Sequence, residues 1–149
     1  MDNYDQALEQ RVWSRVHGTA ESDMVGALRA QALGEWTQIS AFRMLSRQLP
    51  DREKTILKKI IDEDQSHAAC LRGIHLLMTG TPLAVRTVPP TPEAPEAILR
   101  KGYSRKLQTA EAYEAICSDS QYGHVFASLA SQERTHCRIL LEILGTLRK

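Results

Sequence analysis

The chain has few cysteines, and their spacing excludes the usual cysteine-based sites. Cys70, Cys117 and Cys137 are an odd number without a Cys-x-x-Cys pair, which argues against a disulfide framework and against a four-cysteine iron or zinc knuckle. All three fall within helical patterns. We therefore expect buried, inert thiols.

Long apolar runs and an excess of charge of either sign are also missing. No run approaches the roughly 20 apolar residues of a membrane span, and the polar N-terminus has neither the basic nor the apolar region of a signal peptide. We therefore expect a cytoplasmic protein. The 19 basic and 18 acidic residues are spread along the chain, so neither nucleic acid nor a membrane is expected as a partner.

Sustained period-two alternation is absent as well, which excludes most β-sheet architectures and predicts an all-α fold. The 149 residues, with 42% apolar and 25% charged, suit one soluble globular domain. Five of the six prolines lie between residues 81 and 95, where they exclude both helix and central strand. We expect an extended crossover there, over residues 80–95.

The periodic segments on either side of this crossover predict two antiparallel helical hairpins. Pro50 separates the helices of the first hairpin, and Ser118–Ser120 separates those of the second. A short amphipathic helix over residues 4–16, ended by Gly18, is expected to precede them and to cover one end of the bundle. We divide the chain into this helix, over 1–20, and a four-helix bundle over 21–149, with helices expected at 22–49, 51–78, 96–117 and 122–147.

A doubled acid-x-x-His motif carries the chemistry. Asp64 and His67 lie on the second long helix, and Glu133 and His136 lie on the fourth, each pair in the middle of an apolar stripe. Positions i and i+3 share one helix face, so each motif points an oxygen and an imidazole the same way. Glu35 lies in the middle of the first stripe. Two such helices facing each other, with Glu35 beside them, could hold metal ions.

A lysine stands where the pattern predicts a fourth carboxylate. Matching Ala41-Phe42 with Ala112-Tyr113 places Lys106 at the position of Glu35 in the first hairpin. A protonated amine cannot ligate a metal. Two acids on the same helix, Glu111 and Glu114, could replace the missing carboxylate only if the helix were shifted along its axis.

Through Glu35, the two motifs and the two-hairpin layout, residues 22–147 resemble the ferritin-like superfamily, closest to small rubrerythrin-type proteins without an iron-sulfur knuckle. The resemblance implies a four-helix bundle that binds iron or manganese and reacts with oxygen or peroxide. Without its own knuckle, the protein would need an external electron donor. The metal ligands that the resemblance implies are Glu35, Asp64, His67, Glu133 and His136.

The same resemblance implies a reduced site. One metal would be held by Glu35, Asp64 and His67, with Glu133 reaching across, whereas the second would need Lys106, Glu133 and His136. Three carboxylates and one lysine leave two negative charges, which neutralise a single divalent ion in a dry core. Asp64 also lacks one methylene of a glutamate, so it bridges two ions less easily. We expect one ion in preference to two.

Two hypotheses about function follow. In the first, the protein is a metal-binding oxidoreductase that acts on peroxide or oxygen at one iron or manganese ion. In the second, it is a non-catalytic helical interaction module that binds no metal, because a salt-bridge network around Lys106, with Glu133 or Glu35, has replaced the site. In either case we expect a homodimer, since two-fold symmetry is the commonest assembly.

Overall fold

The computed structural model of the chain is built from four helices, and the part that it describes contains no strand. It describes the backbone of residues 3–117 and 121–147, and the side chains of residues 23–117 and 121–147. The all-α prediction is confirmed. The helices are α1 (Asn3–Ser46), α2 (Asp51–Thr79), α3 (Pro95–Cys117) and α4 (Gly123–Thr146).

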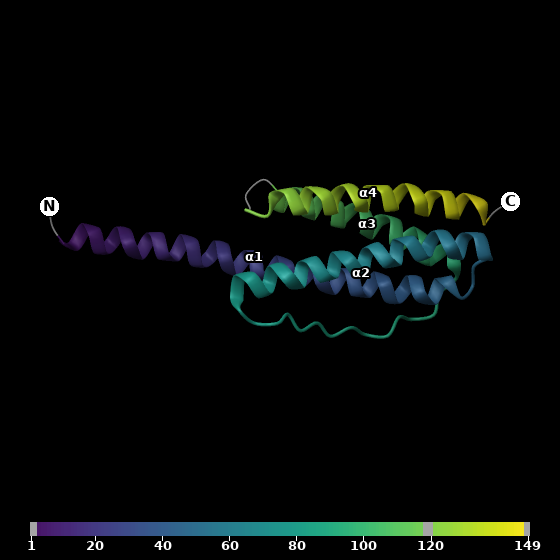
Figure 1. Ribbon diagram of the computed structural model, residues 1–149, viewed down its shortest axis with the longest axis horizontal. Coiled ribbons are helices and arrows are strands. Elements are labelled where there is room, and N and C mark those ends of the chain that lie inside the picture. Colours follow the sequence, from purple (N-terminus) through teal and green to yellow (C-terminus); the bar gives the residue numbers. More distant parts are fainter. Residues whose placement is uncertain (1–2, 118–120, 148–149) are drawn as a thin grey trace.

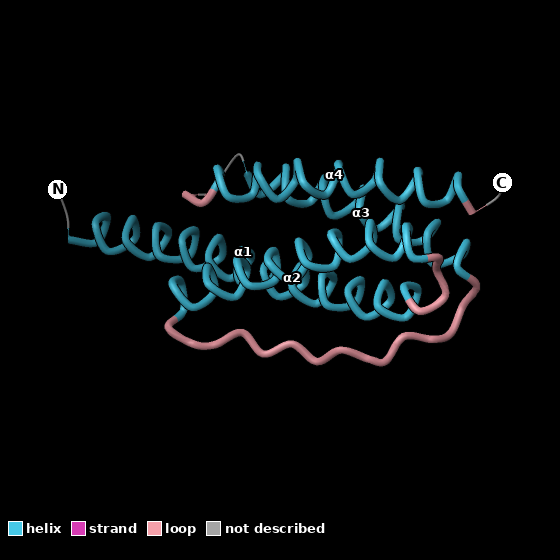
Figure 2. The backbone as a smooth tube through the Cα atoms, turned by 45° about the vertical axis from the view of Figure 1, so that its right-hand side comes forward, coloured by secondary structure: helices cyan, strands magenta, loops and turns pink. Residues whose placement is uncertain are grey.

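The four helices form two hairpins that lie side by side (Figure 1). α1 packs on α2 and α3 on α4, and contacts of α1 with α3 and of α2 with α4 close the bundle. Helices α1 and α4 run in one direction while α2 and α3 run in the other, so every contacting pair is antiparallel. Figure 2 shows the crossover, residues 80–94, passing along the outside of the bundle from the end of α2 to the start of α3.

Local chemistry sets the ends of α2 and the start of α3. α2 begins directly after Pro50, whose backbone is extended, and carries Asp51 and Glu53 in its first turn, where negative charge favours the helix dipole. It ends at Gly80, which has a φ of 71° and donates its backbone N–H to Leu76; this left-handed cap suits glycine. α3 starts at Pro95, whose missing N–H costs nothing in a first turn.

The expected separate helix at the N-terminus is wrong, because α1 continues through Gly18 without a break. A glycine weakens a helix by roughly 1 kcal/mol relative to alanine, but unlike proline it removes no backbone hydrogen bond. Figure 1 shows the first part of α1 projecting beyond the other helices. The predicted apolar stripe of residues 4–16 falls on side chains outside the described residues. At its other end α1 stops at Ser46, earlier than expected, and a turn leads to Pro50.

The core consists of two apolar clusters separated along the bundle by a polar layer. On α1, Glu35 lies between Ala32 of one cluster and Ile39 of the other. Each of the other three helices likewise passes from one apolar cluster to the other near its middle. The larger members are Phe42, Leu45, Leu57, Ile60, Leu99 and Leu140 on one side, and Leu28, Leu71, Tyr113, Phe126 and Leu129 on the other. The polar layer is therefore shielded from solvent at both ends.

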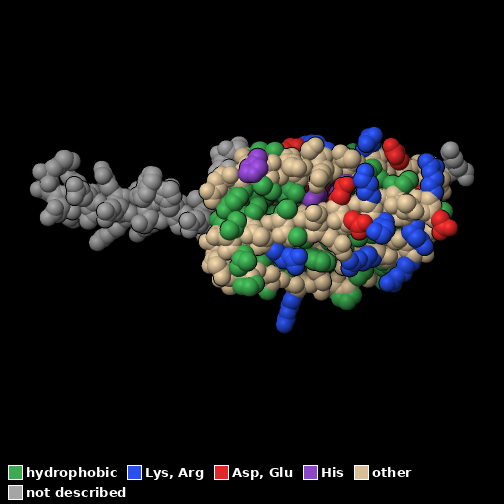
Figure 3. Space-filling model, viewed as in Figure 1, with side chains coloured by type: hydrophobic (Ala, Val, Ile, Leu, Met, Phe, Trp, Pro, Cys, Tyr) green, Lys and Arg blue, Asp and Glu red, His purple; other side chains and the backbone are tan. Residues whose placement is uncertain are grey.

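The surface mixes charges of both signs. On the face in Figure 3, most Lys, Arg, Asp and Glu side chains gather over the half of the bundle where α2 begins and α4 ends, and apolar side chains gather over the other half. None of the helices, over the residues that the structure describes, is long and apolar enough to cross a membrane. The expectation of three buried thiols is confirmed only for Cys137, because Cys70 is exposed and Cys117 is half-buried.

Candidate metal centre

Six ionisable side chains from all four helices meet in the polar layer. Each is at most 3% exposed. Burying ionised groups is costly unless they are paired with opposite charge or bind an ion. The six are Glu35 on α1, Asp64 and His67 on α2, Lys106 on α3, and Glu133 and His136 on α4.

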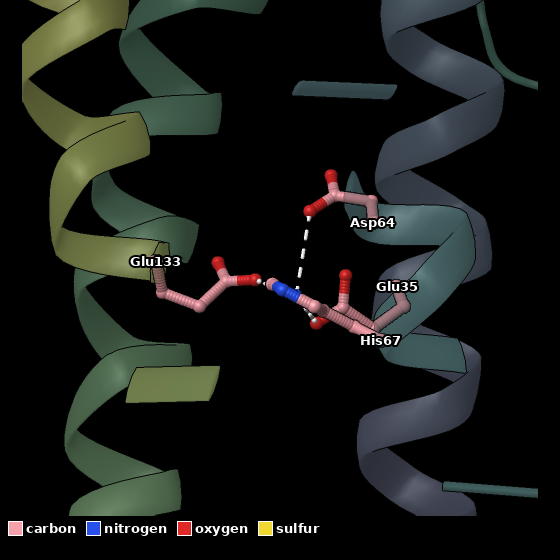
Figure 4. Close-up of side chains that lie close together, drawn as sticks. All are labelled: Glu35, Asp64, His67 and Glu133. Carbon is pink, nitrogen blue, oxygen red and sulfur yellow. Dashed lines mark hydrogen bonds and ion pairs between the residues drawn. The ribbon is translucent and has the colours of Figure 1, made fainter. Parts of the chain in front are cut away.

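His67 lies at the middle of a cluster of three carboxylates (Figure 4). Its Nδ1 is 2.9 Å from Glu133 Oε1 and 3.4 Å from Glu35 Oε1. Asp64 Oδ1, one turn away on the same helix, lies 3.8 Å from that nitrogen. One ligand atom from each residue of the cluster lies within 4.8 Å of the others; the four residues are Glu35, Asp64, His67 and Glu133.

Lys106 fills the space beside this cluster. Its ammonium donates to Asp64 Oδ1 and, at 3.2 Å, to Glu133 Oε1. Burial alone would lower the pKa of Lys106, but the nearby carboxylates of Asp64, Glu133 and Glu35 outweigh burial and raise it. The lysine is therefore a permanent cation of the centre.

Glu35 is held by a tyrosine. The Tyr113 hydroxyl donates to Glu35 Oε1 at 2.7 Å, while Glu35 Oε2 has no hydrogen-bond partner among the described residues. Burial, reinforced by the charges of Asp64 and Glu133, raises the pKa of Glu35 to about 8, although His67 opposes the shift. Burial and the adjacent Glu35 also raise the pKa of Tyr113. Without a metal, burial therefore favours the protonated form of Glu35, and Tyr113 keeps its proton and donates it to the Glu35 carboxyl.

The pKa values of His67 and Glu133 shift in opposite directions because the two side chains are hydrogen-bonded to each other. Burial lowers the pKa of His67, yet its hydrogen bonds to Glu133 and Glu35 outweigh burial and raise the pKa to about 10. Burial raises the pKa of Glu133, but His67 and Lys106 together bring it down to about 2. The metal-free centre thus pairs two cations, His67 and Lys106, with the carboxylates of Asp64 and Glu133.

Gln132 orients the His67 ring from the opposite helix. The His67 Nε2–H donates to the Gln132 side-chain oxygen, which directs Nδ1 to the carboxylates. A partner of this kind fixes the tautomer of a metal-binding histidine. The sequence contains no pattern that marks Gln132, since only the packing of α2 against α4 brings it to His67.

The structure places His136 beside the cluster and not in it. Its Nε2 donates to Glu63 Oε2 at 2.6 Å, and its Nδ1 lies 3.4 Å from Asp64 Oδ1 without forming a hydrogen bond. The ring stacks on His67 with centroids 5.8 Å apart. The partner Glu63 belongs to α2 and precedes the acid-x-x-His motif, so motif spacing alone does not identify it.

Neither acid considered as a replacement carboxylate reaches the centre. Glu111 and Glu114 are both exposed on α3. Glu114 accepts two hydrogen bonds from Arg134 on α4, at 2.6 and 2.9 Å. No shift of α3 brings a carboxylate to the position of Lys106.

The donor set of the cluster could hold a metal ion. One imidazole nitrogen and three carboxylates suit iron or manganese, and buried oxygens of Glu35 and Asp64 lack hydrogen-bond partners in the described structure, as free ligand atoms would. The Lys106 ammonium contacts oxygens of Asp64 and Glu133, so any ion in the cluster would share these two carboxylates with the lysine. It would also be repelled by the ammonium.

Comparison of the chain with protein-family models, with curated proteins and with solved structures found no match in any of the three. The protein is therefore described by its fold and by the residues of the centre alone. Over the residues that the structure describes, the chain is an all-α protein of four helices with a buried cluster of carboxylates and histidine that could hold a metal ion.

Proposed function

We propose that this is a ferritin-like protein of the rubrerythrin type that binds a single iron or manganese ion between α1, α2 and α4. The observation that carries the proposal is the convergence of four ligand atoms within 4.8 Å of one another in a dry core. Helical hairpins joined by one long crossover are the connectivity of ferritin-like bundles, which supports the assignment.

Lys106 limits the site to one ion. Its ammonium supplies a positive charge next to Asp64 and Glu133, where the second ion of a two-metal relative would be bound. The pKa of Lys106 is raised above its ordinary value, so the side chain stays positively charged at neutral pH. The ammonium therefore occupies the place of a second metal ion.

The bound ion would supply redox chemistry toward peroxide or oxygen, with electrons from an external donor. The residues of the chain hold and prepare the site. Gln132 holds the His67 ring with Nδ1 toward the carboxylates, and the Tyr113 hydroxyl oxygen donates a hydrogen bond to Glu35 Oε1 over 2.7 Å. The flanking apolar clusters exclude bulk water from both sides.

The metal content per chain tests the proposal. Protein purified without chelator is incubated anaerobically with ferrous or manganous ion and analysed by elemental mass spectrometry, alongside Lys106→Glu and the uncharged control Lys106→Gln. We expect about one ion per chain in the wild type and in Lys106→Gln, and about two in Lys106→Glu, which restores a fourth carboxylate. Absence of metal from all three proteins would overturn the proposal.

Peroxide consumption tests the redox activity separately. Metal-loaded wild type should remove peroxide in the presence of a chemical reductant, and His67→Leu, which lacks the nitrogen ligand, should not. If the loaded protein binds one ion but consumes no peroxide with any reductant, metal binding stands and the oxidoreductase function fails.

A second candidate function rests on the ion pairs of Lys106. Together with protonated His67, they neutralise Asp64 and Glu133 without a metal. The protein could then be a non-catalytic helical module that acts through a partner or by self-association. On that hypothesis, replacing His67 and His136 together by leucine leaves the protein folded and its metal content unchanged at zero. Loss of bound metal from the double variant would exclude it.

A further inference from the structure

A cleft outside the metal centre lies between α1, α3 and the crossover. Its volume is about 740 Å³, within the range of small-molecule binding sites. Phe42 and Met44 of α1 and Ile98 of α3 supply an apolar lining, and Val88 and Pro90 of the crossover line it from outside. The cleft thus has the volume for a short acyl chain and apolar side chains along part of its wall.

The charged groups that line the cleft favour an anion. Three cations, Arg100, Lys101 and Arg105, face a single carboxylate, Glu93. Glu93 is bound to Lys101 at 2.6 Å, so the lining keeps a net positive charge. A guanidinium fork binds the two oxygens of a carboxylate through parallel hydrogen bonds.

Gln38 adds an unpaired amide. It lines the cleft and is 5% exposed, and neither its amide nitrogen nor its oxygen has a hydrogen-bond partner among the described residues. A buried amide without partners is costly. Rotation about the side-chain bonds of Gln38 would let a ligand in the cleft satisfy both groups, if that ligand carries a donor and an acceptor.

Gln38 and Arg105 lie at the same level of the bundle. The Phe42 ring packs directly on Gly102, and α1 runs antiparallel to α3. At about 1.5 Å of rise per residue, a position four residues before Phe42 therefore lies within about 1.5 Å, along the helix axes, of one three residues after Gly102. The polar end of the cleft combines an amide with a guanidinium, while Met44 and Ile98 lie together toward the other end.

We propose that this cleft binds a small amphipathic carboxylate with an amide next to its charged group and an apolar tail. Arg105 binds the carboxylate, Gln38 pairs with the amide, and Phe42, Met44 and Ile98 cover the tail. The cleft adjoins the metal centre through Phe42, whose ring lies 6.0 Å from the Lys106 ammonium, but none of the proposed metal ligands lines it.

Isothermal titration calorimetry with N-octanoylglycine tests the proposal on the chelator-treated protein. We expect saturable binding of one ligand per chain. N-octanoylglycinamide, which lacks the charge, octanoate, which lacks the amide, and N-acetylglycine, which lacks the tail, should each bind at least about tenfold more weakly. The absence of saturable binding, or equal affinity for the neutral analogue, would overturn the proposal.

Two variants locate the site. Gln38→Leu and Arg105→Gln should each weaken binding by about tenfold or more, whereas Arg72→Gln, on the exposed face of α2, should not change it. Gln38→Leu removes an unpaired buried amide, so its ligand-free melting temperature should match or exceed that of the wild type. Unchanged affinity in both cleft variants would refute this location. None of these outcomes bears on metal content, so the two proposals fail independently.

Discussion

Lys106 brings a buried positive charge into contact with Asp64 and Glu133, and this single side chain changes what the centre can bind. Its ammonium has no access to solvent, so its charge is balanced almost entirely by the two carboxylates. Removing one charge from such a buried group leaves the opposite charges without a partner. The resulting loss of folding free energy is larger than the net contribution of the intact ion pair.

Replacing Lys106 by methionine, which keeps much of its length, should therefore destabilise the metal-free protein by about 3–5 kcal/mol. The loss should shrink when manganous ion is added, because the ion then balances the carboxylates. Urea unfolding followed by circular dichroism measures both effects. Lys58→Met, which breaks an exposed pair with Asp62, is the control and should change stability by less than about 1 kcal/mol. An equal effect of the two substitutions would contradict this account of the centre.

Gln132 offers a second prediction for a single residue. Replacing it by leucine removes the acceptor of His67 Nε2–H, so the ring is no longer held with Nδ1 toward the carboxylates. Metal affinity should fall by about 10- to 100-fold, measured by competition with a chromophoric chelator. Gln48→Leu, in the exposed turn before α2, should leave the affinity unchanged. An affinity that Gln132→Leu does not alter would mean that packing alone orients the ring.

Among the helical elements, α1 and α3 pack closely against each other where Gly102 meets Phe42. A Cβ atom added at Gly102 would lie 2.9 Å from Phe42 Cε1 and 3.0 Å from its Cζ. Phe42 is itself fully packed in the core and lies with its ring centroid 6.0 Å from the Lys106 ammonium. Glycine at position 102 thus allows the two helices to approach on the side of Lys106.

Gly102→Ala should destabilise the bundle by about 1–3 kcal/mol through overpacking, despite the better helix propensity of alanine. Gly73→Ala is a matched control, because Gly73 lies within α2 with no atom within 4 Å of an added Cβ. It should stabilise the protein by about 0.5–1 kcal/mol. Thermal unfolding distinguishes the two signs. Stabilisation by both substitutions would show that Phe42 yields without cost.

At the scale of the whole molecule, the titrating groups of the centre couple stability to pH. Glu35 has its pKa raised to about 8 and His67 to about 10 in the folded protein. The folded state therefore binds more protons than the unfolded chain above about pH 4.5 for Glu35 and above about pH 6.5 for His67. Stability from both groups is present at lower pH and is lost as the pH rises through their folded pKa values.

For the metal-free protein we therefore expect the free energy of unfolding to fall by on the order of 2 kcal/mol or more between pH 5 and pH 10. Glu133, with its pKa lowered to about 2, acts in the opposite sense, but only between about pH 4.5 and pH 2. A metal ion competes with the protons on Glu35 and His67, so stabilisation by metal should increase over the same rise in pH. Urea unfolding at several pH values, with chelator and with manganous ion, gives both trends. A metal-free stability that rises with pH would contradict the charge states assigned to the centre.

Sequence periodicity by itself determined the helices, the crossover and the presence of buried ligand residues. The apolar stripes of Leu57 and Ile60, or of Leu129 and Leu140, fix which face of a helix is buried, and proline excludes helix from the crossover regardless of tertiary context. The same periodicity placed Glu35 and the two motifs on buried faces and Lys106 opposite them. It failed at Gly18, because a glycine weakens a helix without interrupting its hydrogen bonds.

Only the tertiary structure decided which of these residues meet. The sequence treats His67 and His136 as equivalent, yet His67 Nδ1 faces three carboxylates while His136 turns to Glu63. That difference arises from the placement of Lys106, Tyr113 and Gln132, on other helices, around the ligands. The apolar period of one helix does not specify the distances from its side chains to those of another helix. Spacing along the chain specifies a face, whereas the atoms available to an ion depend on how four faces pack together.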